Sequence, residues 1–125
     1  MNLVSIFLIS VALMLPLGLN GCPIELNPSN FRPITSQNMI MVKFYTTWCG
    51  YCKQMCAAFI NLGIRLYETS PVKVGQIDCD RYPQVCNAEG IKSIPTLKYY
   101  RQGCAVQYTG ERTEAAMFNW LVRNA

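Results

Sequence analysis

Two cysteines three positions apart stand where a buried strand should be followed by a helix. Residues 48–53 read Trp-Cys-Gly-Tyr-Cys-Lys. The apolar run Met39–Tyr45 predicts the strand, and the stretch from about Cys52 to Glu68 predicts the helix. The positive end of the helix dipole then lies near the first sulfur and favours its thiolate. A thiolate with a second thiol to resolve it is the minimum apparatus for thiol–disulfide exchange.

Two other roles for this cysteine pair are a zinc site and a structural disulfide. Zinc needs two more ligands, and the chain has no histidine and no second pair with this spacing. A four-residue loop constrains the unfolded chain little, so a purely structural bridge would stabilise little. We therefore interpret Cys49 and Cys52 as redox-active, with Trp48, Gly50, Tyr51 and Lys53 as supporting residues, and expect neither a metal nor an organic cofactor.

Chain length and cysteine content indicate one domain in an oxidising compartment. The 125 residues are 51% hydrophobic, which is enough for a single core. Seven cysteines are many for a reducing cytosol. Eleven basic residues give a net charge of +4, but no two of them are adjacent, so we expect no nucleic-acid partner.

The N-terminus predicts targeting outside the cytosol. No charged side chain precedes Glu25, and Leu3–Leu15 is apolar apart from serines. Pro16, Gly18 and Gly21 suit signal cleavage near residues 18–22, so residues 1–21 are interpreted as a signal peptide and 22–125 as the domain. The alternatives are a retained membrane anchor, or a bacterial lipobox that lipidates Cys22. A membrane partner is expected only if this segment is retained.

The remaining pattern predicts an α/β domain with a mixed sheet. A turn at 27–30 should lead into a short helical or irregular piece that begins at Phe31 and ends at Pro33. Apolar residues at Met55, Phe59, Leu62 and Leu66 should face the sheet. The other expected elements are strands at 24–26, 72–77, 96–100 and 105–108, a helix at 83–89 ended by Gly90, and a last helix capped by Thr113.

Several motifs in this order resemble the thioredoxin superfamily, and within it a catalytic domain of protein disulfide isomerase. The similarity covers about residues 24–123. It is carried by Glu-Leu-Asn-Pro-Ser-Asn-Phe at 25–31, Val-Lys-Phe-Tyr-Thr-Thr-Trp-Cys-Gly-Tyr-Cys-Lys at 42–53, Ile-Asp-Cys-Asp at 77–80, Gly-Ile-Lys-Ser-Ile-Pro-Thr-Leu-Lys-Tyr-Tyr at 90–100 and Tyr-Thr-Gly-Glu-Arg at 108–112. The resemblance implies a thioredoxin fold, a central mixed β-sheet flanked by helices.

The resemblance also implies roles for individual residues. Cys49 should be the exposed attacking thiolate and Cys52 the buried resolving thiol. Ile94-Pro95 should be a cis peptide bond in a loop that binds an extended client, the alternative being an ordinary trans turn. Arg112 corresponds to a mobile arginine that lowers the pKa of the resolving cysteine, and is otherwise a surface residue.

Two substitutions at the site depart from the family pattern. Lys43 stands where the family has a buried carboxylate that accepts the resolving thiol's proton. A neutral amine could act as a base, an ammonium could stabilise thiolates, or the side chain could extend to solvent without a chemical role. Tyr51 replaces the usual histidine between the cysteines, which removes a charge that stabilises the Cys49 thiolate.

The remaining cysteines raise further alternatives. Ala57 replaces a proline usual in the family, and Cys56 before it is either a buried apolar filler or a thiol that captures Cys52. Domains of the family carry a disulfide at the spacing of Cys79 and Cys86, and we expect one here. Cys22, Cys56 and Cys104 are then an odd number, and Cys104 in a hairpin is the best placed of them to link chains.

These observations predict a thiol–disulfide oxidoreductase of the endoplasmic reticulum lumen or the secreted space. Its partners would be client proteins with thiols or disulfides, and glutathione or an upstream oxidase or reductase. One alternative is a non-catalytic thioredoxin-fold binding or chaperone module. Another is a periplasmic thiol reductase anchored by a lipid or a helix.

Overall fold

The structure, a computed structural model, describes residues 21–125. The predicted signal peptide or membrane anchor at residues 1–21 therefore lies outside the described residues, apart from Gly21. The strands are β1 (Ile24–Glu25), β2 (Met39–Tyr45), β3 (Lys73–Asp78), β4 (Thr96–Arg101) and β5 (Cys104–Tyr108). The helices are α2 (Phe31–Gln37), α3 (Gly50–Gln54), α4 (Cys56–Thr69), α5 (Pro83–Ala88) and α6 (Glu114–Asn124).

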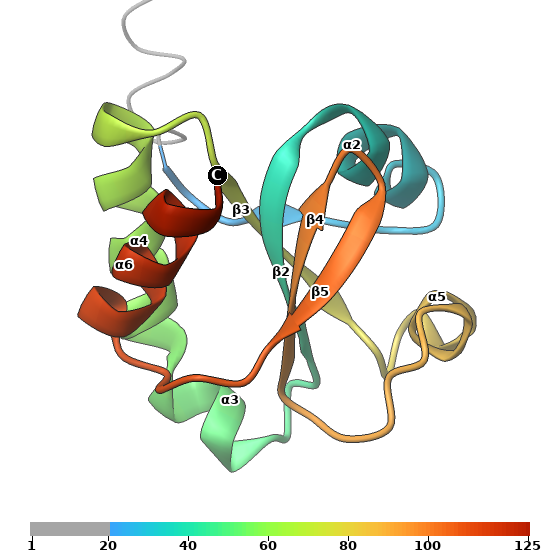
Figure 1. The fold of residues 1–125 in the computed structure, drawn as a ribbon. Coiled ribbons are helices and arrows are strands. Elements are labelled where there is room, and N and C mark those ends of the chain that lie inside the picture. Colours follow the sequence, from blue (N-terminus) through green and yellow to red (C-terminus); the bar gives the residue numbers. More distant parts are fainter. Residues whose placement is uncertain (1–20) are drawn as a thin grey trace, which may run out of the picture.

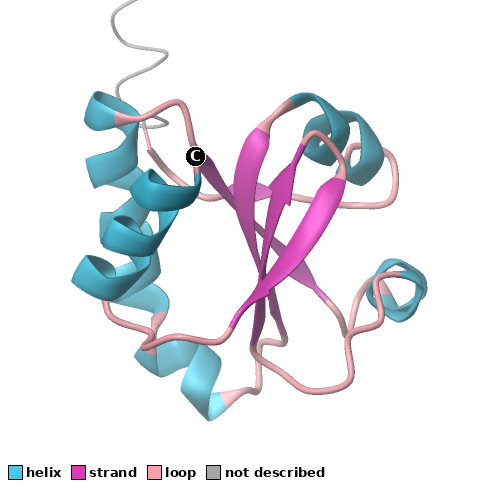
Figure 2. Cartoon of the chain, viewed as in Figure 1, coloured by secondary structure: helices cyan, strands magenta, loops and turns pink. Residues whose placement is uncertain are grey.

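The strands form one mixed sheet in the order β1-β3-β2-β4-β5 (Figures 1 and 2). β1 and β2 both run parallel to β3, whereas β4 is antiparallel to β2 and to β5. β2 is thus a central strand, as its nearly continuous apolar sequence predicted. This is the predicted thioredoxin fold, with a five-stranded sheet and flanking helices.

Helices cover both faces of the sheet. α4 and α6 pack on one face, and α2 and α5 lie on the other (Figure 1). Side chains of β2 alternate between the two layers: Met41 belongs to the core under α4 and α6, whereas Ile40, Val42 and Phe44 belong to the opposite core. The predicted stripe Met55, Phe59, Leu62 and Leu66 is buried in the α4 layer.

Three local predictions were wrong in detail. The predicted continuous helix from Cys52 to Glu68 is two helices, because the chain leaves helical geometry at Met55 (ψ 1°) between α3 and α4. Pro33 does not end its helix, because it lies in the first turn of α2, where a backbone N–H has no intrahelical acceptor to lose. The β4–β5 connection is shorter than predicted, two residues rather than four.

That connection is Gln102-Gly103, with φ of 51° and 87°. Positive φ at both central residues is the geometry of a type I′ hairpin turn, which matches the twist of the flanking strands. The predicted cap of α6 is confirmed. The Thr113 hydroxyl accepts a hydrogen bond from the Ala116 N–H at the start of that helix. Within residues 21–125, none of the helices combines the length and the apolar character needed to cross a membrane.

Candidate active site

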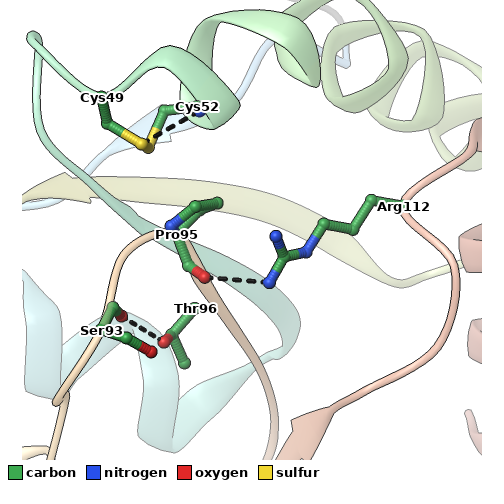
Figure 3. Close-up of a disulfide and its surroundings, with 6 residues drawn as sticks. All are labelled: Cys49, Cys52, Ser93, Pro95, Thr96 and Arg112. Carbon is green, nitrogen blue, oxygen red and sulfur yellow. Dashed lines mark hydrogen bonds between the residues drawn. A yellow bond between two sulfur atoms is a disulfide. The ribbon is translucent and has the colours of Figure 1, made fainter.

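The two cysteines of the Cys-x-x-Cys motif lie between the end of β2 and the start of α3. They form a disulfide with their Cα atoms 5.2 Å apart (Figure 3). Cys49 caps α3: its sulfur accepts a hydrogen bond from the Cys52 N–H at 3.1 Å. After reduction, the same donor would stabilise a thiolate on Cys49.

Exposure does not distinguish the two sulfurs in this oxidised state. Cys49 is 6% exposed and Cys52 is 4% exposed. The prediction that Cys49 is exposed is therefore not met here, because the disulfide turns its sulfur toward Cys52. Around the pair, Trp48 and Tyr51 are 67% and 69% exposed.

Gly50 and Lys53 complete the motif. Both are exposed. A side chain at Gly50 would meet no atom within 4 Å, so this glycine leaves open space beside the disulfide. Lys53 lies in the last turn of α3, where its charge is favourable to the helix dipole.

The loop before β4 lies next to the disulfide (Figure 3). The Ile94-Pro95 peptide bond is cis. The Thr96 hydroxyl donates a hydrogen bond to the Ser93 carbonyl and ties the two sides of the loop together. This loop and Trp48 border a cavity of about 240 Å³ that extends to the Cys79–Cys86 bridge.

Arg112 approaches the site from the loop before α6. Its guanidinium donates a hydrogen bond to the Pro95 carbonyl at 3.0 Å (Figure 3). This contact joins the C-terminal part of the chain to the proline loop, although the two residues are far apart in sequence. The predicted effect of Arg112 on Cys52 remains a prediction.

Lys43 lies in β2, inside the protein. It is 4% exposed, so little of the residue reaches solvent. Its amine lies 5.1 Å from the Phe59 ring centroid and 5.3 Å from that of Tyr45, at distances typical of cation–π contacts. Burial lowers the pKa of Lys43, and the charges of Cys56 and Glu25 oppose that shift. The base and ammonium roles both remain open.

The other cysteines are distributed over the fold. Cys79 and Cys86 form a disulfide with Cα atoms 5.7 Å apart, which ties the end of β3 to α5. Cys56 and Cys104 are exposed thiols, and Cys22 is exposed as well. The prediction that Cys56 is a buried filler is therefore wrong, because it faces outward at the first residue of α4. Within the described part of the chain, no three acidic or cysteine side chains are grouped as metal ligands would be.

Thr46 also belongs to the site, although it was not among the predicted site residues. Its hydroxyl is buried and, within residues 21–125, has no hydrogen-bond partner, and the residue lines the cavity beside Trp48. Its carbonyl accepts a hydrogen bond from the Cys49 N–H at 3.3 Å. Its place directly after a buried strand and before the cysteines was the available signal.

Comparisons with known proteins agree with this geometry. The Thioredoxin family model matches residues 23–123. Protein disulfide-isomerase of Drosophila melanogaster is 30% identical over 96 residues, or 75% of this chain and 19% of that protein. A probable protein disulfide-isomerase ER-60 of Schistosoma mansoni is 32% identical over 105 residues, or 82% of this chain and 22% of that protein. This chain thus spans about a fifth of the length of these relatives.

A solved structure shows the same arrangement. The first thioredoxin domain of mouse Protein disulfide-isomerase A4 superposes with a TM-score of 0.73 and 27% identity, covering 83% of this chain and 75% of that one. The sheet order, the cysteine pair and the family match over almost all described residues lead to one conclusion. The chain belongs to the thioredoxin family, and protein disulfide isomerases are its distant homologues.

Proposed function

We propose that this protein is a dithiol–disulfide oxidoreductase of the protein disulfide isomerase type. The observation that carries the proposal is the Cys49–Cys52 disulfide at the β2–α3 junction, with a backbone N–H on the Cys49 sulfur and the proline loop beside it. The distant homologues named as protein disulfide isomerases support the same activity.

The proposed reaction is thiol–disulfide exchange at Cys49. In oxidation, a client thiolate attacks the Cys49–Cys52 disulfide, a mixed disulfide with Cys49 forms, and Cys52 leaves as a thiolate. A second client thiolate then displaces Cys49, so that the client is oxidised and the pair reduced. In isomerisation or reduction, the Cys49 thiolate attacks a client disulfide and Cys52 resolves the intermediate. The partners would be such clients, and glutathione or an upstream oxidase or reductase.

We propose the endoplasmic reticulum lumen or the secreted space as its location. The homologues include protein disulfide isomerases, and the Cys79–Cys86 bridge suits an oxidising compartment. A periplasmic form, anchored by a lipid or a helix, is the alternative. Mass spectrometry of the mature N-terminus would separate these, because a lipidated Cys22 is heavier than a free amine.

Insulin reduction by dithiothreitol tests the activity. The wild-type chain should accelerate it, Cys49→Ser should abolish the acceleration, and Cys104→Ser should leave it unchanged, because Cys104 is an exposed thiol on β5. A titration of the Cys49–Cys52 pair in glutathione buffers then gives the direction. A reduction potential of roughly −270 mV favours a reductase, and one of about −180 mV or higher favours an oxidase or isomerase.

A non-catalytic binding module is the second candidate. The observation in its favour is Lys43, a lysine at the position of the family's buried carboxylate. Such a module would bind unfolded clients equally well with serine at position 49, and would not accelerate insulin reduction. If the wild-type chain and Cys49→Ser bind unfolded clients equally well and neither accelerates insulin reduction, the binding module replaces the catalytic proposal.

A further inference from the structure

The two edge strands of the sheet within residues 21–125 differ in how they are protected. β1, at one edge, is two residues long and carries Glu25. β5, at the other edge, is five residues long (Figure 1). An edge strand exposes a row of unpaired N–H and C=O groups, which proteins usually protect by a short length, a charge, a proline or a bulge. β1 has the short length and the charge, so β5 is the edge that is open to a further strand.

Within the part of the chain that the structure describes, β5 has none of these protections. Its sequence, Cys-Ala-Val-Gln-Tyr, has no charged residue and no proline, and it pairs residue by residue with β4 without a bulge. Its first four residues are exposed, and Val106 at its centre is 55% exposed. On the same face, half-buried Trp120 packs against Tyr99, the β4 residue that pairs with Val106. Apolar surface therefore continues from the centre of this edge toward α6.

The hairpin geometry fixes which backbone groups point outward from β5. In a hairpin with a two-residue turn, the residues that flank the turn exchange both of their hydrogen bonds, and such pairs alternate with non-hydrogen-bonded pairs along the ladder. Arg101 and Cys104 flank the turn and form such a pair. Bonding to β4 then alternates along β5, so the N–H and C=O groups of Ala105 and Gln107 point away from β4, toward the edge.

These outward groups are self-complementary about Val106. When the β5 strands of two copies pair antiparallel, Ala105 of one copy lies opposite Gln107 of the other, and the reverse pair forms as well. Each of these pairs exchanges both of its hydrogen bonds. Val106 then lies opposite Val106 of the second copy in a non-hydrogen-bonded pair, where the Cα atoms are about 4.5 Å apart and the side chains are close. This register uses the full length of both strands.

The charges around β5 are compatible with the same pairing. Arg101 lies at the turn end of the strand, where it pairs with Cys104. At the other end, the Tyr108 hydroxyl donates a hydrogen bond to the Glu111 carbonyl, and Glu111 and Arg123 are the charged residues that act on Tyr108. Antiparallel pairing brings Arg101 of one copy toward Glu111 of the other, and it opposes no two like charges within the ladder.

We propose that β5 is an interaction surface for a second copy of this chain, paired antiparallel about Val106. The two sheets then continue into one another across a two-fold axis, which gives a closed and symmetric interface. Five residues on each copy bury less than the standard interface of about 1,600 Å², so the dimer is weak and depends on concentration. In this register Cys104 lies opposite Tyr108 of the second copy, so a disulfide between the two Cys104 residues does not form.

Cysteine cross-linking of the full chain tests the register. Val106→Cys, in a Cys104→Ser background, places the introduced sulfurs opposite each other at a Cα distance that a disulfide accepts. Gln107→Cys in the same background is the matched control, because its two copies lie more than about 7 Å apart along and across the strands. Under mild oxidation, Val106→Cys should cross-link at least about tenfold faster, with the linkage located by peptide mass spectrometry.

Analytical ultracentrifugation of the full chain tests the association without an introduced cysteine. The dimer fraction of the wild-type chain should rise with protein concentration. Val106→Lys should weaken the association about fivefold or more, because like charges then face each other across the two-fold axis. Val122→Lys, at an exposed valine of α6, is the matched control and should leave the association unchanged.

Three results would overturn the proposal. The first is a wild-type chain that stays monomeric up to millimolar concentration, and the second is equal cross-linking of Val106→Cys and Gln107→Cys. The third is an edge that binds an unfolded client, in a way that Val106→Lys weakens, without any self-association. The measurements record a cross-link and an association constant and not client turnover, so their outcome is independent of the insulin assay.

Discussion

At the scale of single residues, Lys43 has the environment least suited to its charge. The side chain is almost wholly buried in β2, and no carboxylate lies within salt-bridge distance of its amine in the described part of the chain. Two aromatic rings offset part of the desolvation cost. Burial of a lysine without a charged partner lowers the stability of the fold. The presence of Lys43 at this position therefore bears on the chemistry of the site.

Lys43→Met should therefore stabilise the fold by about 1–2 kcal/mol at neutral pH. Burial lowers the pKa of Lys43 in the folded state below its ordinary value of 10.5. The unfolded chain then binds more protons between the folded pKa and 10.5, so wild-type stability rises with pH across that window. The difference in unfolding free energy between Lys43→Met and the wild type should therefore shrink as the pH rises.

Urea unfolding of both proteins from neutral pH to about pH 10 measures this difference. Both proteins contain the same tyrosines, so the comparison removes the tyrosines' contribution to the pH dependence of stability. Tyr45 is one of them, and burial raises its pKa to about 12. A constant difference across the range would show that folding leaves the pKa of Lys43 unshifted, and a loss of stability in Lys43→Met would show that the amine makes a net favourable contribution.

Arg112 is the second residue at which a single contact bears on the site. Its hydrogen bond to the Pro95 carbonyl holds the proline loop against the loop before α6. Arg112→Ala should slow insulin reduction about three- to tenfold, since a less ordered loop binds the client less productively. Arg32→Ala, at a highly exposed arginine of α2, is the matched control, and equal rates for the two variants would exclude the role of Arg112.

At the scale of elements, α5 depends on the bridge between Cys79 and Cys86. The helix has only six residues, and no side chain caps its start. An isolated helix of that length is unstable. Replacing both cysteines by alanine should therefore destabilise the protein by roughly 2–3 kcal/mol on the chain-entropy model, and should increase amide exchange in α5 before other helices.

Urea unfolding and hydrogen exchange measure these two effects. Cys104→Ala removes an exposed thiol that has no bridge and should change stability by less than about 0.5 kcal/mol. Uniform exchange in the double variant, with α5 as protected as before, would show that packing of Val85 and Tyr82 on the α2-side core is enough to order the helix.

Local patterns predicted most elements because each pattern has a local cause. The buried strand at 39–45, the stripe of α4 and the Thr113 cap need only their own segments to be recognised. The break at Met55 was not predicted, because neither proline nor glycine lies near it in the sequence. The type I′ turn was missed because Gln102, a residue without a preference for positive φ, occupies its first position.

Some residues of the candidate site could be predicted from the sequence, and others could not. The spacing of Cys49 and Cys52 indicated the redox pair directly, whereas Ile94-Pro95 and Arg112 came from the family resemblance. The contact between Lys43 and Phe59 was not predictable, because it arises where β2 packs against α4. Thr46 was missed because a buried hydroxyl without a partner is a property of the folded site and not of its sequence.

At the scale of the whole molecule, two cores share one sheet. The core under α4 and α6 and the core under α2 and α5 are both lined by alternate residues of β2. Loss of packing in one core therefore weakens the strand that supports the other. We expect the domain to unfold as one cooperative unit, as small single domains usually do.

Leu121 and the two tryptophans allow this expectation to be tested. Leu121 of α6 is fully buried, and Leu121→Ala should cost about 3 kcal/mol, whereas Val122→Ala at its exposed neighbour should cost less than about 0.5 kcal/mol. Trp120 packs edge-on against Tyr99 and Tyr108 in the same layer, while Trp48 is beside the redox pair.

Single-tryptophan variants, Trp48→Phe and Trp120→Phe, each in the Leu121→Ala background, then report from opposite regions of the fold. Coincident urea midpoints at both positions mean that damage in α6 is transmitted through the sheet to the cysteine pair. An earlier transition at Trp120 than at Trp48 would instead show that α6 separates from a still-folded active site. In that case the α2-side core and the β2–α3 junction would form the more stable unit, and the redox pair would survive the loss of α6.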